Sequence, residues 1–220
     1  MKGNFVDNIS TIVASPTTLL TLGGVILLVV ALLRMKKVTF NARMMAHIGL
    51  ALALAAILHA FKLYHMPQGG SVTLGSMIPI LLMAFFYGPA FGYLTGFLYG
   101  LINLIQDPYI LHPIQVLFDY PLPFMALGLA GYFKDRYLVG TVVGIVGRFI
   151  FHYISGIVFF ASYAPPGVSP YLYSFLFNAS YLSMECIVCV VIMRMLPIKR
   201  IEMTIRQQVI VSDNFKDNKV

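Results

Sequence analysis

The sequence predicts an all-α fold, a polytopic membrane helical bundle, from its composition and from the length of its apolar runs. Of the 220 residues, 59% are hydrophobic and only 10% are charged, whereas soluble domains usually carry about 25% charged residues. Several apolar runs approach the roughly 20 residues that a helix needs to cross a bilayer. Both observations indicate a chain that crosses the membrane several times.

Seven apolar runs are candidate spans, and each is separated from the next by a chemically distinct break. The runs lie at about 17–34, 43–63, 73–88, 90–106, 114–133, 138–162 and 170–196. Charged breaks follow the first and fifth runs, and breaks that contain proline or glycine follow the others. Proline removes a backbone donor and glycine permits unusual dihedral angles, so both are typical of helix ends.

The first run could also be a secretory signal peptide. It is too long for a typical apolar signal region, is preceded by Asp7 with little positive charge, and lacks a clear cleavage site of small residues. We therefore expect a retained helix and three regions: an extra N-terminal transmembrane helix at 1–37, a membrane domain at 38–197, and a polar cytoplasmic tail at 198–220.

The distribution of lysine and arginine predicts the orientation of the chain. If the spans alternate in direction, most basic residues fall on one side, whereas Lys2 and Lys62 fall clearly on the other. The residues of the basic side are Arg34, Lys36, Lys37, Arg43, Lys134, Arg136, Arg194, Lys199, Arg200 and Arg206. Cytoplasmic loops carry such an excess. We expect the N-terminus outside and the C-terminus in the cytoplasm, and the net charge of +7 then needs no nucleic-acid partner.

This topology brings polar residues of the C-terminal half to the outer membrane face. Asp119 lies near the outer end of its span, and His152 lies in the outer half of the next. Tyr173 and Asn178 lie in the first turns of the last span. Polar and ionisable residues within a membrane are costly and often mark functional sites. The sequence therefore predicts a site at this face.

Asp119 and its possible partners admit more than one interpretation. A carboxylate in a span is costly unless it is partnered or wetted, so Asp119 either forms an ion pair with Arg148 or serves as a counter-charge for a cationic ligand. Arg148 and His152 are four residues apart and share a helix face. We favour a structural Arg148, paired with Asp119 or Glu185. His152 is either a satisfied core residue or a residue that donates a hydrogen bond or presents its ring face to a ligand.

Seven aromatic residues crowd the same outer region. They are Tyr109, Tyr120, Phe159, Phe160, Tyr163, Tyr171 and Tyr173. They could form the aromatic belt of a membrane interface, or a cage whose ring faces attract a cation. Together with an aspartate and a few polar groups, a cage would suit a flat, cationic, heteroaromatic ligand.

The sequence predicts neither a metal site nor an enzyme. Cys186 and Cys189 form a lone CxxC in an apolar run, which is more typical of buried small residues than of a metal site. No second histidine accompanies His152 at ligand spacing. The chain contains no Walker A sequence, no GxSxG and no HExxH. We expect no cofactor and no ATP hydrolysis by a P-loop.

The run at 43–63 contains three pairs of small residues, each pair four positions apart. The pairs are Gly49/Ala53, Ala51/Ala55 and Ala56/Ala60. Small residues at this spacing let helix backbones approach closely in lipid. They could serve packing within the chain or the docking of another membrane subunit.

Three segments carry a resemblance that covers about residues 40–196. They are SVTLGSMIPI, QVLFDYPLPF and RFIFHYISGIVFF with the following YAPPGVSPYLYSFLFN. In this order they resemble the thiamine-specific substrate-binding subunits, or S-components, of energy-coupling factor transporters. The resemblance implies a six-helix substrate-binding core at 38–197, which makes the first run an addition to the core. It also implies thiamine as the transported ligand.

The resemblance also implies which residues contact thiamine. They are Asp119, Tyr120, Tyr109, His152, Gly156, Phe160, Tyr173 and Asn178. The family usually has the longer glutamate at the position of Asp119. This chain has no tryptophan, so one family tryptophan corresponds to Phe160 and another falls near Gly69. The loop HMPQGGS, with Gly69 and Gly70 as hinges, is expected to act as a lid.

The resemblance implies a division of labour in a bacterial cell membrane. The subunit would capture thiamine outside and dock, through the face of Ala51 and Ala55, on a membrane coupling subunit driven by two cytoplasmic ATPases. Two alternatives stay open. The ligand could be a thiamine precursor or another aromatic vitamin. The chain could instead be an autonomous cation-coupled carrier, with Asp119 and His152 as a proton relay.

Overall fold

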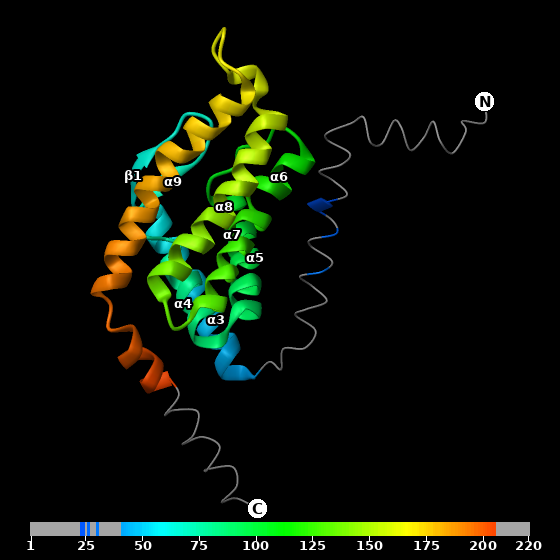
Figure 1. Ribbon diagram of the computed structural model, residues 1–220. Helices are drawn as coiled ribbons and strands as arrows, with labels where there is room; N and C mark the ends of the chain where they lie inside the picture. Colours follow the sequence, from blue (N-terminus) through cyan, green and yellow to red (C-terminus); the bar gives the residue numbers. More distant parts are fainter. Residues whose placement is uncertain (1–22, 25, 27–29, 31–40, 206–220) are drawn as a thin grey trace, which may run out of the picture.

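The computed structural model describes residues 23, 24, 26, 30 and 41–205. Apart from residues 23, 24, 26 and 30, the helix expected at 17–34 and the region 1–37 lie outside the described residues, as does most of the tail 198–220. Residues 41–205 form a bundle of helices with one small antiparallel sheet (Figure 1). The predicted all-α class is confirmed.

The described chain begins with a helix and a hairpin. α3 spans Ala42–Ala60, and the side chain of Asn41 caps it by accepting a hydrogen bond from the Met44 N–H at 2.8 Å. β1 (Lys62–His65) and β2 (Ser71–Thr73) then pair antiparallel. The helix α4 covers only Ile78–Tyr87, so the span predicted at 73–88 begins five residues too early.

The hairpin turn explains this correction. Gly69 and Gly70 have φ angles of 86° and 88°, in the left-handed region that glycine occupies readily. The Met66 N–H donates to the Gly70 carbonyl at 2.9 Å, and the Gly69 N–H donates to the Met66 carbonyl at 3.2 Å. The chain therefore reverses within the HMPQGGS loop, and the residues on either side pair as strands before α4 begins.

The span predicted at 114–133 is three consecutive helical segments. α5 (Pro89–Gln106) precedes it, and α6 (Pro113–Asp119), α7 (Pro121–Ala126) and the 3-10 helix η1 (Leu127–Phe133) follow in order. Proline at the start of α7 has no backbone N–H to continue the helix from α6. The break places Asp119 at the end of a helix.

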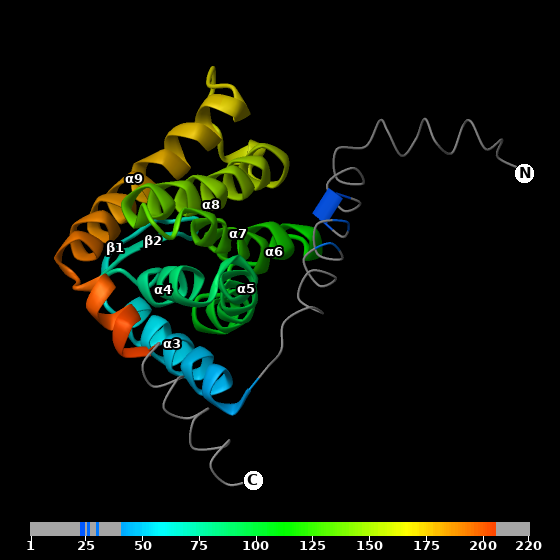
Figure 2. The same cartoon turned by 60° about the horizontal axis from the view of Figure 1, so that its bottom comes forward.

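The last two long helices form the wall of the bundle that matters most for the site. α8 spans Tyr137–Phe159 and α9 spans Pro170–Met195, with the short 3-10 helix η2 (Ala161–Tyr163) between them. α8 packs along α9 and against α7 and η1, while β2 contacts both α9 and α3. Viewed from the end of the bundle, the hairpin lies between α9 and α4 (Figure 2).

Glycines bring α5 and α7 into near backbone contact. A Cβ on Gly96 would lie 2.1 Å from the Phe124 carbonyl oxygen, and one on Gly100 would lie 2.5 Å from the Tyr120 carbonyl oxygen. Such a close approach excludes any larger residue. This packing fixes the position of the break between α6 and α7, where Asp119 and Tyr120 lie.

Four helical segments of the described chain are long and apolar enough to cross a membrane. They are Ala42–Ala60, Pro113–Phe133, Tyr137–Phe159 and Pro170–Met195. Large apolar side chains on their outer surfaces, such as Leu50, Val142 and Ile187, are exposed, as expected for helices that face lipid. The hairpin, α6 and the α8–α9 connection lie toward one end of the bundle, and the start of α3 and the end of α9 lie toward the other (Figure 1).

The predicted tail begins with ordered structure. Residues 198–205 are helical, and Ile198 is 4% exposed and packs into the main apolar core with Met193 and Ile145. The part of the tail that the structure describes is therefore attached to the bundle by an apolar anchor.

Candidate functional site

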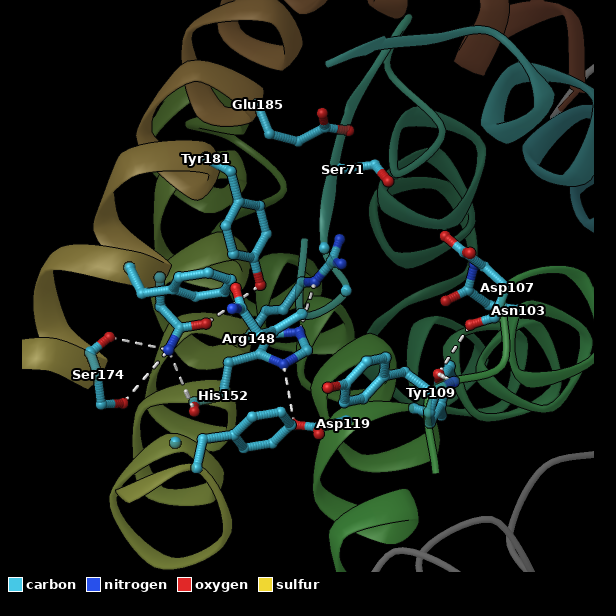
Figure 3. A pocket seen from close by; sticks show the side chains of 18 of the residues that line it. Ser71, Asn103, Asp107, Tyr109, Asp119, Arg148, His152, Ser174, Tyr181 and Glu185 are labelled. Atoms are coloured by element: carbon cyan, nitrogen blue, oxygen red, sulfur yellow. Dashed lines mark hydrogen bonds and ion pairs between the residues drawn. The ribbon is translucent and has the colours of Figure 1, made fainter. Parts of the chain in front are cut away.

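A cavity opens between α8, α9, the hairpin and the chain that leads from α5 into α6 (Figure 3). Its volume is about 80 Å³, whereas one buried water needs roughly 10–15 Å³. The space therefore admits a small organic molecule rather than a single water. The ten residues predicted for the ligand site and its lid all line this cavity: Asp119, Tyr120, Tyr109, His152, Gly156, Phe160, Tyr173, Asn178, Gly69 and Gly70.

Both carboxylate oxygens of Asp119 accept hydrogen bonds. Oδ2 accepts from Gln115 Nε2 at 2.5 Å, and Oδ1 lies 3.3 Å from His152 Nδ1. The 15% exposed Asp119 side chain is thus fixed by α6 on one side and by α8 on the other. It stands at the cavity wall with its direction set.

Gln115 is a site residue that the sequence reasoning missed. Its side chain is buried, and besides Asp119 it donates to the Tyr109 carbonyl at 3.0 Å and accepts from the Leu111 N–H at 3.0 Å. It therefore connects the carboxylate to the loop that carries Tyr109. Its role could have been predicted, because Gln115 and Asp119 are four residues apart and therefore share a helix face.

The predicted ion pair of Arg148 with Asp119 or Glu185 is wrong. Among the described residues no ion pair joins Arg148 to either carboxylate. Instead Arg148 Nε donates to His152 Nε2 at 3.2 Å, and the guanidinium lies over the Phe124 ring at 4.2 Å from its centroid. The imidazole stands between the arginine and Asp119 (Figure 3), and the ring face of Phe124 stabilises the buried cation.

Glu185 is occupied by the hairpin. Its carboxylate accepts from the Thr73 N–H at 2.5 Å and from the Thr73 hydroxyl at 2.6 Å, and its side chain is 1% exposed. Because Thr73 belongs to β2 and Glu185 to α9, this carboxylate joins the hairpin to the bundle. Glu185 also lines the cavity.

The aromatic residues of the region divide into two groups. Tyr109, Tyr120, Phe160 and Tyr173 line the cavity. The Tyr109 and Phe160 rings stack with centroids 5.8 Å apart and planes 23° apart. By contrast, Tyr171 is 62% exposed. The first group therefore forms the aromatic part of the cavity lining.

Tyr109 is held by a second tyrosine. Its hydroxyl lies 3.0 Å from the Tyr163 hydroxyl, and this hydrogen bond raises the pKa of Tyr109 to about 12. The hydroxyl is therefore uncharged at neutral pH. The backbone of Tyr109 is also held, because its N–H donates to the Tyr120 hydroxyl at 2.6 Å.

Three of the residues predicted to contact the ligand also contribute to the packing and hydrogen bonds around the cavity. The Tyr120 hydroxyl donates to the Asp107 carbonyl at 2.8 Å and so shapes the loop. A Cβ on Gly156 would lie 2.1 Å from Ser174 Oγ, so only glycine lets α8 approach α9 there. Asn178 donates to the Ser174 carbonyl at 2.9 Å, and its Oδ1 accepts from the Tyr181 hydroxyl at 3.3 Å.

Asp107 is a second carboxylate at the cavity that the sequence reasoning did not select. Its Oδ2 accepts from Lys62 Nζ at 2.7 Å and lies 3.8 Å from both His59 Nε2 and His65 Nδ1. It therefore connects the loop after α5 to the end of α3 and to β1. Only its place before proline in the QDPYILHP loop could have drawn attention to it.

The prediction that Ala51 and Ala55 form a docking face does not fit the structure. Ala51 is 6% exposed and Ala55 is fully buried, and both belong to apolar clusters within the bundle. Their small side chains serve packing inside the chain. The other face of α3, with Gly49 and Ala53, is exposed.

Metal binding finds no support in the described part of the chain, where no group of three or more histidine, cysteine, aspartate and glutamate side chains could hold an ion. Cys189 is buried in the apolar core, and Cys186 lies half-buried beside it on α9. Both act as small apolar residues of the helix interface.

Comparison with known proteins gave consistent matches. The sequence model described as "Thiamine transporter protein (Thia_YuaJ)" matches residues 45–205. The "Thiamine transporter ThiT" of Bacillus subtilis (strain 168) is 38% identical over 148 residues, which are 60% of this chain and 77% of that protein. The ThiT of Lacticaseibacillus paracasei is 26% identical over 140 residues, 54% of this chain and 70% of that protein.

A solved structure is also similar. ThiT from Listeria monocytogenes superposes with a TM-score of 0.65 at 25% sequence identity, covering 73% of this chain and 96% of that chain. The likeness therefore extends over nearly the whole of that structure.

Proposed function

The chain belongs to the thiamine transporter protein family and is a multi-pass membrane protein of thiamine uptake, and from that premise we propose that it binds thiamine in the cavity between α8 and α9. We further propose that it is the substrate-binding subunit of an energy-coupling factor importer. In this role it captures thiamine from outside and delivers it by docking on a separate energising module.

One observation carries the proposal for the site. A directed carboxylate, a histidine and stacked aromatic rings from separate segments converge on one cavity. Thiamine combines a permanently cationic thiazolium ring with a hydrogen-bonding aminopyrimidine ring. Carboxylates attract such a charge, and electron-rich ring faces add roughly 0.5–2 kcal/mol per cation contact. The wall of the cavity thus complements both halves of the ligand.

The lining residues divide the work. Asp119 pairs with the thiazolium charge or accepts from the aminopyrimidine, and His152, Tyr173 and Asn178 fix the orientation by hydrogen bonds. Phe160, Tyr109 and Tyr120 supply ring contacts. The hairpin turn with Gly69 and Gly70 covers the ligand by backbone contact, in place of a tryptophan side chain. This last assignment follows from a chain without tryptophan.

The direction of transport and the partners belong to the same proposal. The end of the bundle with the hairpin, α6 and the α8–α9 connection faces outside, the N-terminus is outside and the C-terminus is cytoplasmic. The chain contains no P-loop sequence, which supports energy from a membrane coupling subunit and two cytoplasmic ATPases. Docking would use the exposed face of α3 with Gly49 and Ala53, since Ala51 and Ala55 are buried.

Thiamine binding by the purified full chain tests the site. Asp119→Asn removes the charge, and Asn178→Ala removes the amide that donates from α9 to the His152 carbonyl of α8 at 3.3 Å. We expect both variants to abolish high-affinity binding in isothermal titration calorimetry. Asp135→Asn is the matched control, because Asp135 is exposed in the loop between η1 and α8 and should bind as wild type does. Unchanged binding in both site variants would contradict the site.

Two further measurements separate this proposal from its alternatives. An uncharged pyrimidine precursor should compete more weakly than thiamine if Asp119 neutralises the thiazolium. Lipid vesicles that contain the chain alone should bind thiamine without accumulating it. Uptake driven by a cation gradient in such vesicles would favour an autonomous carrier and overturn the dependence on ATPase partners.

A further inference from the structure

Arg148, His152 and Asp119 form a continuous chain of hydrogen bonds across the cavity wall. Arg148 Nε lies 3.2 Å from His152 Nε2, and His152 Nδ1 lies 3.3 Å from Asp119 Oδ1. Arg148 is 7% exposed. The two charged groups are therefore separated by one imidazole ring, and the state of that ring decides how each of them is balanced (Figure 3).

We propose that Arg148 is a positioning residue that holds His152 as the neutral Nδ1–H tautomer, so that the imidazole donates to an ionised Asp119. An arginine side chain has donors and no acceptor. The contact from Arg148 Nε therefore requires a lone pair on His152 Nε2. In a neutral imidazole the proton is then on Nδ1, the nitrogen that faces Asp119.

The other two states of His152 conflict with the geometry. An Nε2–H tautomer would turn one N–H toward another at Arg148 and present a lone pair to the Asp119 carboxylate. An imidazolium would keep the first conflict and add a second positive charge beside the guanidinium, which like-charge repulsion disfavours. Only the Nδ1–H tautomer satisfies both contacts at once.

The assignment has a consequence for ligand binding, which rests on the proposed thiamine site. A neutral His152 orients Asp119 without cancelling its charge, so the carboxylate remains free to balance a cationic ring. An imidazolium at the same place would form an ion pair with Asp119 and compete with the ligand. Arg148 lines the same cavity, and its guanidinium lies against the ring of Phe124.

The tautomer can be measured without any ligand. Nitrogen-15 NMR of the full-length, detergent-solubilised protein reports the protonation of each imidazole nitrogen, and the His152 signals are assigned by their loss in His152→Gln. We expect a protonated Nδ1 and a non-protonated Nε2 at neutral pH. An Nε2–H tautomer or an imidazolium would overturn the proposal. Because thiamine is absent, this result is independent of the proposed function.

Arg148→Met tests the role of the arginine, since methionine retains apolar bulk over Phe124 and removes the donor. We expect mixed or protonated His152 states and a loss of thiamine affinity of about ten- to a hundredfold, as for one lost hydrogen bond from a charged donor. Arg148→Lys, which keeps a charged donor, should restore the Nδ1–H tautomer in part. Arg194→Met, at an exposed position near the end of α9, is the matched control.

Two outcomes would count against the positioning role. One is a wild-type His152 spectrum in Arg148→Met, and the other is lost affinity with an unchanged tautomer, which would indicate a purely structural arginine. If Arg148→Met does not fold, the wild-type tautomer still decides the proposal. If the tautomer is as expected but neither the wild type nor Arg148→Met binds thiamine, the proposed ligand is wrong and the tautomer assignment stands.

Discussion

The two strands of the hairpin are held to the bundle by different kinds of contact. All residues of β2 are buried, whereas all residues of β1 are exposed. β2 is joined to α9 by the buried hydrogen bonds between Thr73 and Glu185. β1 is joined to the loop after α5 by the partly exposed ion pair between Lys62 and Asp107. The same small sheet is thus held by buried hydrogen bonds at β2 and by a partly exposed ion pair at β1.

This difference indicates how a lid could open without loss of the fold. Buried hydrogen bonds to a carboxylate are costly to break because the donors are left without an acceptor. A partly exposed ion pair contributes little and is weakened by salt. Any movement that uncovers the cavity should therefore begin at β1 and at the turn, while β2 stays with α9.

Among the variants that test this difference between β1 and β2, those at Glu185 should reduce stability most. Glu185→Ala removes the acceptor of the Thr73 N–H and leaves the Thr73 hydroxyl with Ser76 Oγ, 3.0 Å away, as its acceptor. We expect the free energy of unfolding to fall by about 2–5 kcal/mol for two lost hydrogen bonds to a buried carboxylate. Thermal unfolding in detergent measures the change. Glu185→Gln keeps an oxygen acceptor for one donor and should lose less. A loss in Glu185→Ala no larger than in Lys62→Met would contradict an anchored β2.

The turn allows a sharper test, because two adjacent glycines share one conformation and differ in their surroundings. A Cβ on Gly70 would lie 2.9 Å from the Tyr181 ring, whereas one on Gly69 would meet only Tyr109 Cβ at 3.6 Å. Positive φ costs about 1–2 kcal/mol for a non-glycine residue at either position. Gly70→Ala should therefore reduce stability more than Gly69→Ala in the same assay.

The excess effect of Gly70→Ala should also reach the site. Tyr181 donates to Asn178 Oδ1, so displacement of its ring disturbs the amide proposed to contact thiamine. We expect weaker thiamine binding in Gly70→Ala than in Gly69→Ala. Equal losses in both variants would indicate that backbone strain alone decides the behaviour of the turn.

Much of the fold was predictable because hydrophobic length is a direct physical signal. The helices α3, α5, α8 and α9 lie within a few residues of their predicted spans. The hairpin was not predicted, because strands of three and four residues leave no periodic pattern and the apolar residues after the turn appeared to continue a helix. The break between α6 and α7 was likewise hidden in an apolar run, although Pro121 marks it.

The site was predicted as a set of residues and less well as a set of contacts. Membrane topology and family resemblance together predicted a set of residues that the structure brings together around one cavity. The partner of Arg148 was predicted wrongly, because a charge count cannot show that His152 stands between it and Asp119. Small residues misled in a similar way, since Ala51 and Gly49 have the same local pattern and only packing decides which face is buried.

The smallest effect on stability and the most specific effect on kinetics are expected at β1. Lys62→Met breaks the ion pair with Asp107. The Lys62 and Asp107 side chains are 29% and 27% exposed, so we expect the free energy of unfolding to fall by less than about 1 kcal/mol.

If β1 is the part that opens, thiamine should dissociate faster from Lys62→Met than from wild type in stopped-flow measurements. Salt should accelerate dissociation from wild type by screening this pair, and Lys62→Met should no longer respond. Lys134→Met, exposed in the loop before α8, is the control and should keep the salt response. A salt response retained in Lys62→Met would show that another contact holds the lid.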